Sequence, residues 1–212
     1  MDDRLTDLTV RRLIDRLATS DPVPGGGSAA ALAGAMGAAL VQMVVALSTG
    51  RPAAAGHEGS LDQVGAEAAA AQAALLDLAE RDAAAYDAVV RARRLPRDSE
   101  EDRQARDLRV ADAVDAATRA PLETARVAAN VFGLAELLTP IGNRNAISDV
   151  GVAALLAATA LRGSALNVEI NLPSLAADDP LRSDAAAEIA SLLAAIDARE
   201  RAVRIAVAER LR

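Results

Sequence analysis

Three glycines and a serine at the start of an uncharged stretch form the most distinctive group of residues in the sequence. Gly25, Gly26 and Gly27 follow the sequence PVP, and Ser28 is the expected N-cap of a helix. Glycine allows a ligand to approach the backbone closely, and the free N–H groups of a first helical turn bind carboxylate or carbonyl oxygens. The pattern predicts a ligand-facing turn, with a purely structural tight turn as the alternative. No Gly-Lys-Ser/Thr sequence follows, so it is not a P-loop.

An acid and a phenol lie one helical turn apart in the run ERDAAAYDAVVRARRLP. Asp82 and Tyr86 therefore share a helix face, although an exposed surface helix is the alternative reading. The sequence has no cysteine and a single histidine, His57, which falls in a Gly/Ala-rich loop and is expected at the surface. This composition excludes thiol nucleophiles and multi-histidine metal sites, so no metal site is predicted.

Polar residues also flank a second apolar stretch. Asn143, Ser148 and Asp149 lie in GNRNAISDVG before it, and an ordinary N-cap at Asp149 or Ser148 is the alternative to a functional role. Asn167 and Asn171 lie one turn apart near its end, where asparagine usually satisfies backbone groups.

The composition predicts an all-α protein. With 212 residues the chain suits a single domain, 1–212, and only 1% of its residues are aromatic. Alanine dominates the apolar residues, and strand formers never alternate over a useful length. A net charge of −7 argues against nucleic-acid binding, and the residues after Met1 show no signal-peptide pattern, so a cytoplasmic location is expected.

The helical pattern predicts an up-and-down bundle with two nearly uncharged inner helices. The expected helices cover residues 5–19, 28–49, 61–94, 99–119, 121–138, 150–168 and a last one from 180. Ser99 with Asp102 resembles a capping box, and Pro121 is expected to break or kink one helix and begin the next.

The uncharged run 28–49 is long enough to raise the question of a membrane. Its alanines and glycines gain little from hydrocarbon, and Gln42 interrupts it, so the better interpretation is a buried central helix. Gly34 and Gly37 would let another helix pack closely, from this chain or from a second subunit.

Four stretches occur in an order that resembles the folate cyclodeaminase/cyclohydrolase family. They are PVPGGGSAAALAGAMGAALVQMV, DAAAYDAVVRARRLP, ATRAPLETA and GNRNAISDVGVAALLAATALRGSALNVEINL. The family includes methenyltetrahydrofolate cyclohydrolase and the cyclodeaminase part of formiminotransferase-cyclodeaminase. The resemblance implies an all-α bundle that forms a homodimer and binds a folate near the glycine-rich helix start. It implies a tetrahydrofolate derivative as substrate and no metal or tightly bound cofactor.

The resemblance leaves three functions open. A cyclohydrolase adds water to 5,10-methenyltetrahydrofolate to give 10-formyltetrahydrofolate, and it is favoured because the chain carries no formiminotransferase part. A formiminotetrahydrofolate cyclodeaminase, which releases ammonia, is the alternative. Family members commonly carry a lysine-rich stretch where this sequence reads STGRPAAAGHEGS, so a divergent member that binds another ligand is the third.

The resemblance also implies roles for individual residues. Asp82 is the first choice for the acid/base, and Asp149 is the second, as a substrate-binding carboxylate or a helix cap. Arg51 is the candidate cation for the glutamate tail of the folate. The expected substrate-binding residues are Gly25, Gly26, Gly27, Ser28, Gln42, Arg51, Tyr86, Asn143, Asn167 and Asn171.

Overall fold

Helices make up all the regular secondary structure in the computed structural model, which describes residues 4–212. The α-helices are α1 (Val10–Leu17), α2 (Gly26–Ser48), α3 (Glu58–Arg93), α4 (Glu100–Ile141), α5 (Ile147–Asn171), α6 (Pro180–Ala194) and α7 (Ile196–Arg210). Short 3-10 helices cover Leu5–Asp7, Pro52–Ala54, Arg144–Ala146 and Leu172–Ser174. The all-α prediction is confirmed for this part of the chain, and residues 1–3 of the predicted domain 1–212 lie outside it.

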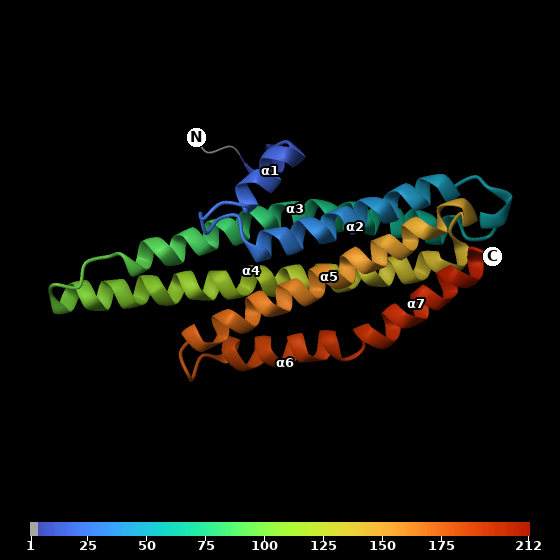
Figure 1. Cartoon of the computed structure of the whole chain (residues 1–212). Helices are drawn as coiled ribbons and strands as arrows, with labels where there is room; N and C mark the ends of the chain where they lie inside the picture. Colours follow the sequence, from blue (N-terminus) through green and yellow to red (C-terminus); the bar gives the residue numbers. More distant parts are fainter. Residues whose placement is uncertain (1–3) are drawn as a thin grey trace.

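Helices α2 to α5 form the predicted up-and-down bundle (Figure 1). Each runs antiparallel to the next, and α2 packs against both α3 and α5. Because α3 and α4 are longer than α2 and α5, their hairpin extends past the start of α2 and the end of α5 (Figure 1). Helices α6 and α7 lie along α4 and α5, so one end of the bundle keeps a projecting α3–α4 arm.

The two uncharged helices pack against each other through small residues. A Cβ on Gly37 would lie 3.1 Å from the carbonyl oxygen of Ala153 in α5, and a Cβ on Gly34 would lie 3.2 Å from Cβ of Ala160. The close approach that the glycines predicted therefore occurs within this chain.

Two helical segments, Gly26–Ser48 and Arg144–Ser174, are long and apolar enough to cross a membrane by length and hydropathy. Half of the most apolar window in each is buried inside the bundle. Half of the residues in each apolar window of α2 and α5 thus pack in the centre of the fold.

Helix α4 is continuous from Glu100 to Ile141, and the predicted new helix at Pro121 is wrong. A proline lacks the N–H that would bond the carbonyl four residues earlier, here that of Ala117. The side-chain amide of Asn171 donates to that carbonyl oxygen at 2.8 Å. A long-range hydrogen bond thus replaces the missing helical one, and α4 continues.

Several predicted helix ends also differ from the structure. Gly25, not Ser28, is the N-cap of α2, because the helical backbone already begins at Gly26. Ser28 lies inside the first turn, with its hydroxyl 3.0 Å from the Ala79 carbonyl oxygen of α3. Neither Ser148 nor Asp149 caps α5, which begins at Ile147 directly after a 3-10 turn, so both lie inside its first turn. The expected helix 5–19 is interrupted before α1, where the Thr9 side chain caps a new helix start.

At other helix ends the predictions are confirmed. Ser99 and Asp102 form the predicted capping box at the start of α4, and the last segment begins at Pro180 as expected, where the side chain of Asp179 caps α6. The segment after Pro180 is two helices, however, because the chain turns at Ala195 before α7 begins.

Ion pairs connect the outer helices α6 and α7 to α4 of the bundle. Arg126 of α4 binds Glu188 of α6 at 2.6 Å, and Arg199 of α7 binds Glu136 of α4 while its guanidinium lies 5.0 Å from the centre of the Phe132 ring. These contacts stabilise the face of the bundle that α6 and α7 cover, away from the glycine turn.

Candidate active site

A cavity of about 560 Å³ lies where α2 begins and α5 ends, with α3 and α4 as walls. It has the volume typical of sites for drug-sized ligands. Seven of the predicted site residues line it together: Gly25, Gly26, Gly27, Asp82, Tyr86, Asn167 and Asn171. The remaining lining residues are Pro22, Val23, Ala83, Val89, Arg93, Ala117, Ile170 and Ser174. The sequence motifs therefore converge on one site although they are far apart in the chain.

The carboxyl group of Asp82 is held against the first turn of α2. Its Oδ2 lies 2.9 Å from the Ser28 hydroxyl, and the Ser28 backbone N–H also acts on the carboxyl group. The Ser28 hydroxyl lies 3.0 Å from the carbonyl oxygen of Ala79 as well. One hydroxyl has one proton to donate. If Asp82 is ionised, the Ser28 hydroxyl donates its proton to the carboxylate and leaves the Ala79 carbonyl without this bond. If Asp82 is protonated, its O–H can donate to the Ser28 oxygen, and the Ser28 hydroxyl then donates to the Ala79 carbonyl.

Burial raises the pKa of Asp82 above its ordinary value, and the hydrogen bonds from the side chain and backbone of Ser28 offset part of that rise. A carboxyl group with a raised pKa exchanges protons closer to neutral pH, which suits a general acid or base. The sequence predicted that a ligand oxygen would bind at the N-terminus of α2. In the structure the carboxyl group of Asp82 lies there instead.

Gly27 is the glycine that makes this arrangement possible. A Cβ built on Gly27 would overlap the carboxyl group of Asp82, whereas one on Gly26 would lie 3.6 Å from Nδ2 of Asn167, an ordinary contact. The sequence alone does not distinguish the three glycines. The structure separates them, because only Gly27 faces the acid.

The two asparagines of α5 line the cavity, and their amide nitrogens are already bonded. The Asn167 amide nitrogen donates to the Gly163 carbonyl at 2.8 Å, and that of Asn171 donates to the carbonyls of Ala117 and Asn167. Within residues 4–212 no hydrogen bond engages the Oδ1 atom of either side chain. These oxygens can accept hydrogen bonds from a ligand that carries N–H groups, as a pterin does.

Four predicted site residues lie elsewhere in the chain's fold. Helix α2 rises about 33 Å from its first to its last residue, and Arg51, Asn143 and Asp149 lie around its far end. Asn143 donates from its side chain to the Leu47 carbonyl, and Gln42 donates to Gln72 at 2.6 Å. These groups do not reach Asp82 within one chain.

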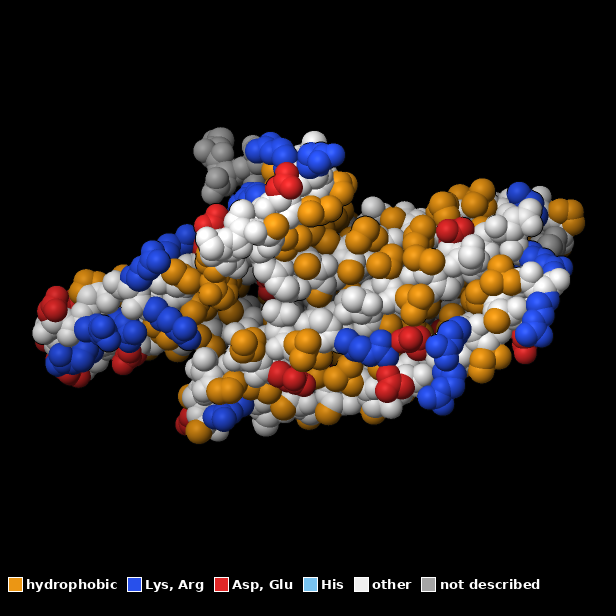
Figure 2. All heavy atoms as spheres, in the orientation of Figure 1, with side chains coloured by type: hydrophobic (Ala, Val, Ile, Leu, Met, Phe, Trp, Pro, Cys, Tyr) orange, Lys and Arg blue, Asp and Glu red, His pale blue; other side chains and the backbone are white. Residues whose placement is uncertain are grey.

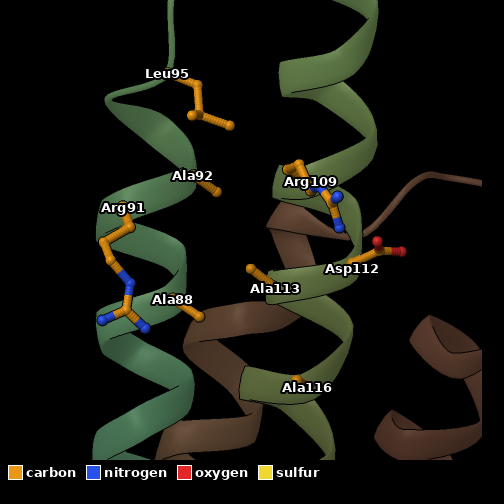
Figure 3. Close-up of a pocket in the computed structure, with 8 residues that line it drawn as sticks. All are labelled: Ala88, Arg91, Ala92, Leu95, Arg109, Asp112, Ala113 and Ala116. Carbon is orange, nitrogen blue, oxygen red and sulfur yellow. The ribbon is translucent and has the colours of Figure 1, made fainter.

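A second hollow lies on another face of the α3–α4 arm (Figure 3). Alanines and Leu95 face one another across it, while Arg91, Arg109 and Asp112 lie at its edges (Figure 3). This groove of about 420 Å³ is open and apolar and contains no buried acid. Among the described residues, no group of three or more His, Cys, Asp or Glu side chains could hold a metal ion. The cavity at Asp82 is therefore the stronger site for acid–base chemistry.

Arg93 and Ile170 are two of the eight lining residues that were not predicted from the sequence. Both fall within motifs that the sequence contains, RARRLP and LNVEINL, but neither was singled out. The helical spacing could have found Arg93, which lies eleven residues, about three turns, after Asp82 on the same helix.

Known proteins resemble this chain over most of its length. A family model described as formiminotransferase-cyclodeaminase matches residues 9–191. A protein named methenyltetrahydrofolate cyclohydrolase, from Methylorubrum extorquens, is 42% identical over 167 residues, which cover 79% of this chain and 80% of that protein.

Two further relatives carry the cyclodeaminase name. Formimidoyltransferase-cyclodeaminase from Rattus norvegicus is 31% identical over 189 residues, which are 89% of this chain but 35% of that longer protein. The crystal structure of formiminotetrahydrofolate cyclodeaminase from Thermotoga maritima superposes with a TM-score of 0.85 at 26% identity, covering 97% of this chain and 98% of that one. The resemblance that the four motifs indicated is confirmed: the chain belongs to the formiminotransferase-cyclodeaminase family.

Proposed function

We propose that this chain is a methenyltetrahydrofolate cyclohydrolase, which converts 5,10-methenyltetrahydrofolate and water to 10-formyltetrahydrofolate. The observation that carries the proposal is the Asp82 carboxyl group, which is held by Ser28 in a cavity with the volume typical of sites for drug-sized ligands. The 42% identity to a protein of that name favours this reaction over the cyclodeaminase alternative.

In the proposed reaction Asp82 acts first as a base and then as an acid. The bridging carbon of the substrate is cationic, so the carboxylate favours it electrostatically and accepts a proton from the attacking water. The C–O bond then forms. As the bond from that carbon to N5 breaks, protonated Asp82 gives its proton to N5, and the new hydroxyl loses its proton to solvent. The products are an N10-formyl group, an N5–H group and one released proton, and the steps need neither a metal nor a redox cofactor.

The direct test is the turnover of 5,10-methenyltetrahydrofolate, followed by the loss of its near-ultraviolet absorbance above the spontaneous rate. We expect acceleration that scales with enzyme concentration. Ammonia release from 5-formiminotetrahydrofolate without this activity would instead identify a cyclodeaminase. No turnover of either substrate and no thermal shift with any reduced folate would point to a divergent member with another ligand.

Replacing Ser28 with Ala is expected to shift the pH dependence of the reaction. Loss of the hydroxyl removes a hydrogen bond that lowers the pKa of Asp82, so that pKa rises further. Because the base form is lost as pH falls through this pKa, the acidic limb of the kcat/KM profile should move to higher pH. Ser164→Ala is the matched control, since the Ser164 hydroxyl is buried without a hydrogen-bond partner in the described residues. A limb that stays in place in Ser28→Ala would contradict the role of Ser28.

We also propose that the protein is a homodimer that pairs through the outward face of α2. Six apolar residues at alternating spacings of four and three follow that face. Met36, Met43 and Leu47 are exposed, and the half-buried ones are Ala29, Ala33 and Leu40. Such spacing is typical of helix–helix seams, and Figure 2 shows hydrophobic side chains gathered along α2.

The dimer can be tested by measuring mass in solution with light scattering. We expect a dimer for the wild type and a monomer for Met36→Glu, because the Met36 side chain is 55% exposed and lies at the centre of the seam. Leu108→Glu, at a 69% exposed position on α4, should leave the dimer intact. A monomeric wild type at micromolar concentrations would contradict the proposal.

A further inference from the structure

The cavity has a cation at its outer end. Arg93 is the sole Lys or Arg among the residues that line the cavity, whereas Arg51, the cation expected from sequence, lies beyond the far end of α2. Helix α3 continues past the start of α2 and the end of α5 (Figure 1), and Arg93 is its last residue. It therefore lies at the end of the site toward the tip of the arm, and this end is called the outer end.

Four side chains of α3 that differ in chemical character line the cavity one after another along the helix. Asp82, Tyr86, Val89 and Arg93 occur at i, i+4, i+7 and i+11, which is one helix face. An acid thus stands at the inner end, a phenol and an isopropyl group in the middle, and a guanidinium at the outer end. Eleven residues of helix rise about 16 Å, and the flexible arginine side chain shortens the distance that a ligand must bridge.

The Arg93 guanidinium is available to bind a ligand. Three other arginines form ion pairs with carboxylates of another helix: Arg126, Arg162 and Arg199. Across residues 4–212, by contrast, no ion pair or side-chain hydrogen bond engages Arg93, and only its backbone carbonyl accepts a bond, from Arg106. Figure 2 shows the basic side chains along this arm, where a carboxylate from solvent would meet them.

We propose that Arg93 binds the glutamate α-carboxylate of the folate substrate and thereby fixes its direction in the cavity. The inference rests on the proposed function. The reacting bridge then lies at Asp82 and the glycine turn, the aminobenzoyl ring lies along Tyr86 and Val89, and the glutamate reaches Arg93. A planar guanidinium matches a carboxylate through two parallel N–H···O bonds, which makes arginine suited to this task.

The test compares two substrates that differ only in the glutamate. The wild type should turn over 5,10-methenyltetrahydrofolate with a lower KM than 5,10-methenyltetrahydropteroate, which lacks the glutamate. Arg93→Gln should raise the KM for the folate by about 10- to 100-fold, as expected for losing a charged hydrogen bond. It should leave the KM for the pteroate and both kcat values unchanged, because Arg93 does not touch the reacting atoms.

Two matched variants make the result specific. Arg91→Gln changes a cation at the edge of the groove in Figure 3, on another face of the same helix, and Arg51→Gln changes the cation that sequence analysis favoured. Both should keep the preference for the glutamate-bearing substrate. The proposal is overturned if Arg93→Gln raises both KM values equally, or if Arg51→Gln removes the preference and Arg93→Gln does not.

A failure of the proposed function would look different. If the wild type turns over neither compound, the binding of tetrahydrofolate and tetrahydropteroate is compared by calorimetry. Tighter binding of tetrahydrofolate that Arg93→Gln abolishes would support the glutamate site even without the reaction. Equal affinity of the wild type for both compounds would overturn it.

Discussion

Replacing Asp82 with Asn is expected to lower kcat for methenyltetrahydrofolate hydrolysis by about 100-fold or more, the usual contribution of a positioned general acid or base. Asn is nearly isosteric with Asp and keeps an oxygen that can accept hydrogen bonds from Ser28. It cannot take up the proton from water or return one to N5. The loss should therefore appear in the chemical step, with a smaller change in KM.

The same substitution should not lower the stability of the protein at neutral pH. Because the pKa of Asp82 is raised in the folded state, the folded protein binds this proton more tightly than the unfolded chain does. The stability that this gives is present below the ordinary value of 3.8 and is lost as pH rises through the folded-state pKa. At pH 7 the wild type bears the cost of a partly buried charge that a neutral asparagine side chain does not carry, so the variant should unfold at an equal or higher temperature.

Thermal unfolding and steady-state kinetics of the same preparations would check both expectations. Asp87→Asn is the control, because Asp87 is an exposed carboxylate on the same helix, five residues from Asp82. Full activity of Asp82→Asn would exclude Asp82 as the acid/base. A large fall in its melting temperature at pH 7 would mean that the carboxyl group serves the fold and not the reaction.

Much of the bundle could be predicted because its signals are local. The uncharged runs that became α2 and α5, the capping box at Ser99 and the N-cap at Asp179 depend on residues close together in sequence. The predicted helix break at Pro121 was wrong because the signal that decides it is not local. The effect of this proline on α4 is compensated by Asn171, 54 residues from the carbonyl it binds, and no local pattern signals such a bond.

The site was predicted in part for a similar reason. Motifs near the start of α2 and the end of α5 converge because antiparallel helices bring those ends together. Asn143 and Asp149 lie at the start of the segment that becomes α5, whereas Asn167 lies near its end. In an up-and-down bundle the two ends of one helix of 25 residues lie about 37 Å apart. A list of polar residues cannot distinguish those ends until the direction of each helix is known.

Gly27→Ala is expected to be almost as damaging to activity as Asp82→Asn, although it adds a single methyl group. The added Cβ would overlap the Asp82 carboxyl group, which must then leave its hydrogen bonds with Ser28. Gly27 does not have a positive φ, so alanine is not excluded by its backbone conformation. Overpacking costs about 1–3 kcal/mol, and the better helix propensity of alanine returns at most about 1 kcal/mol. We expect a net loss of stability and a fall in kcat of about 100-fold, as for the loss of the acid itself.

The neighbouring glycine and a double mutant separate this clash from any general effect on the helix. Gly26→Ala should leave the stability of the protein almost unchanged, because its Cβ would make an ordinary contact with Asn167. In an Asp82→Ala background the overlapping group is gone, so Gly27→Ala should cost little or even stabilise α2. Measured by urea unfolding, the two substitutions should therefore be strongly non-additive. Additive costs would mean that Gly27 and Asp82 do not compete for the same space, and that the glycine turn has some other reason to exclude a side chain.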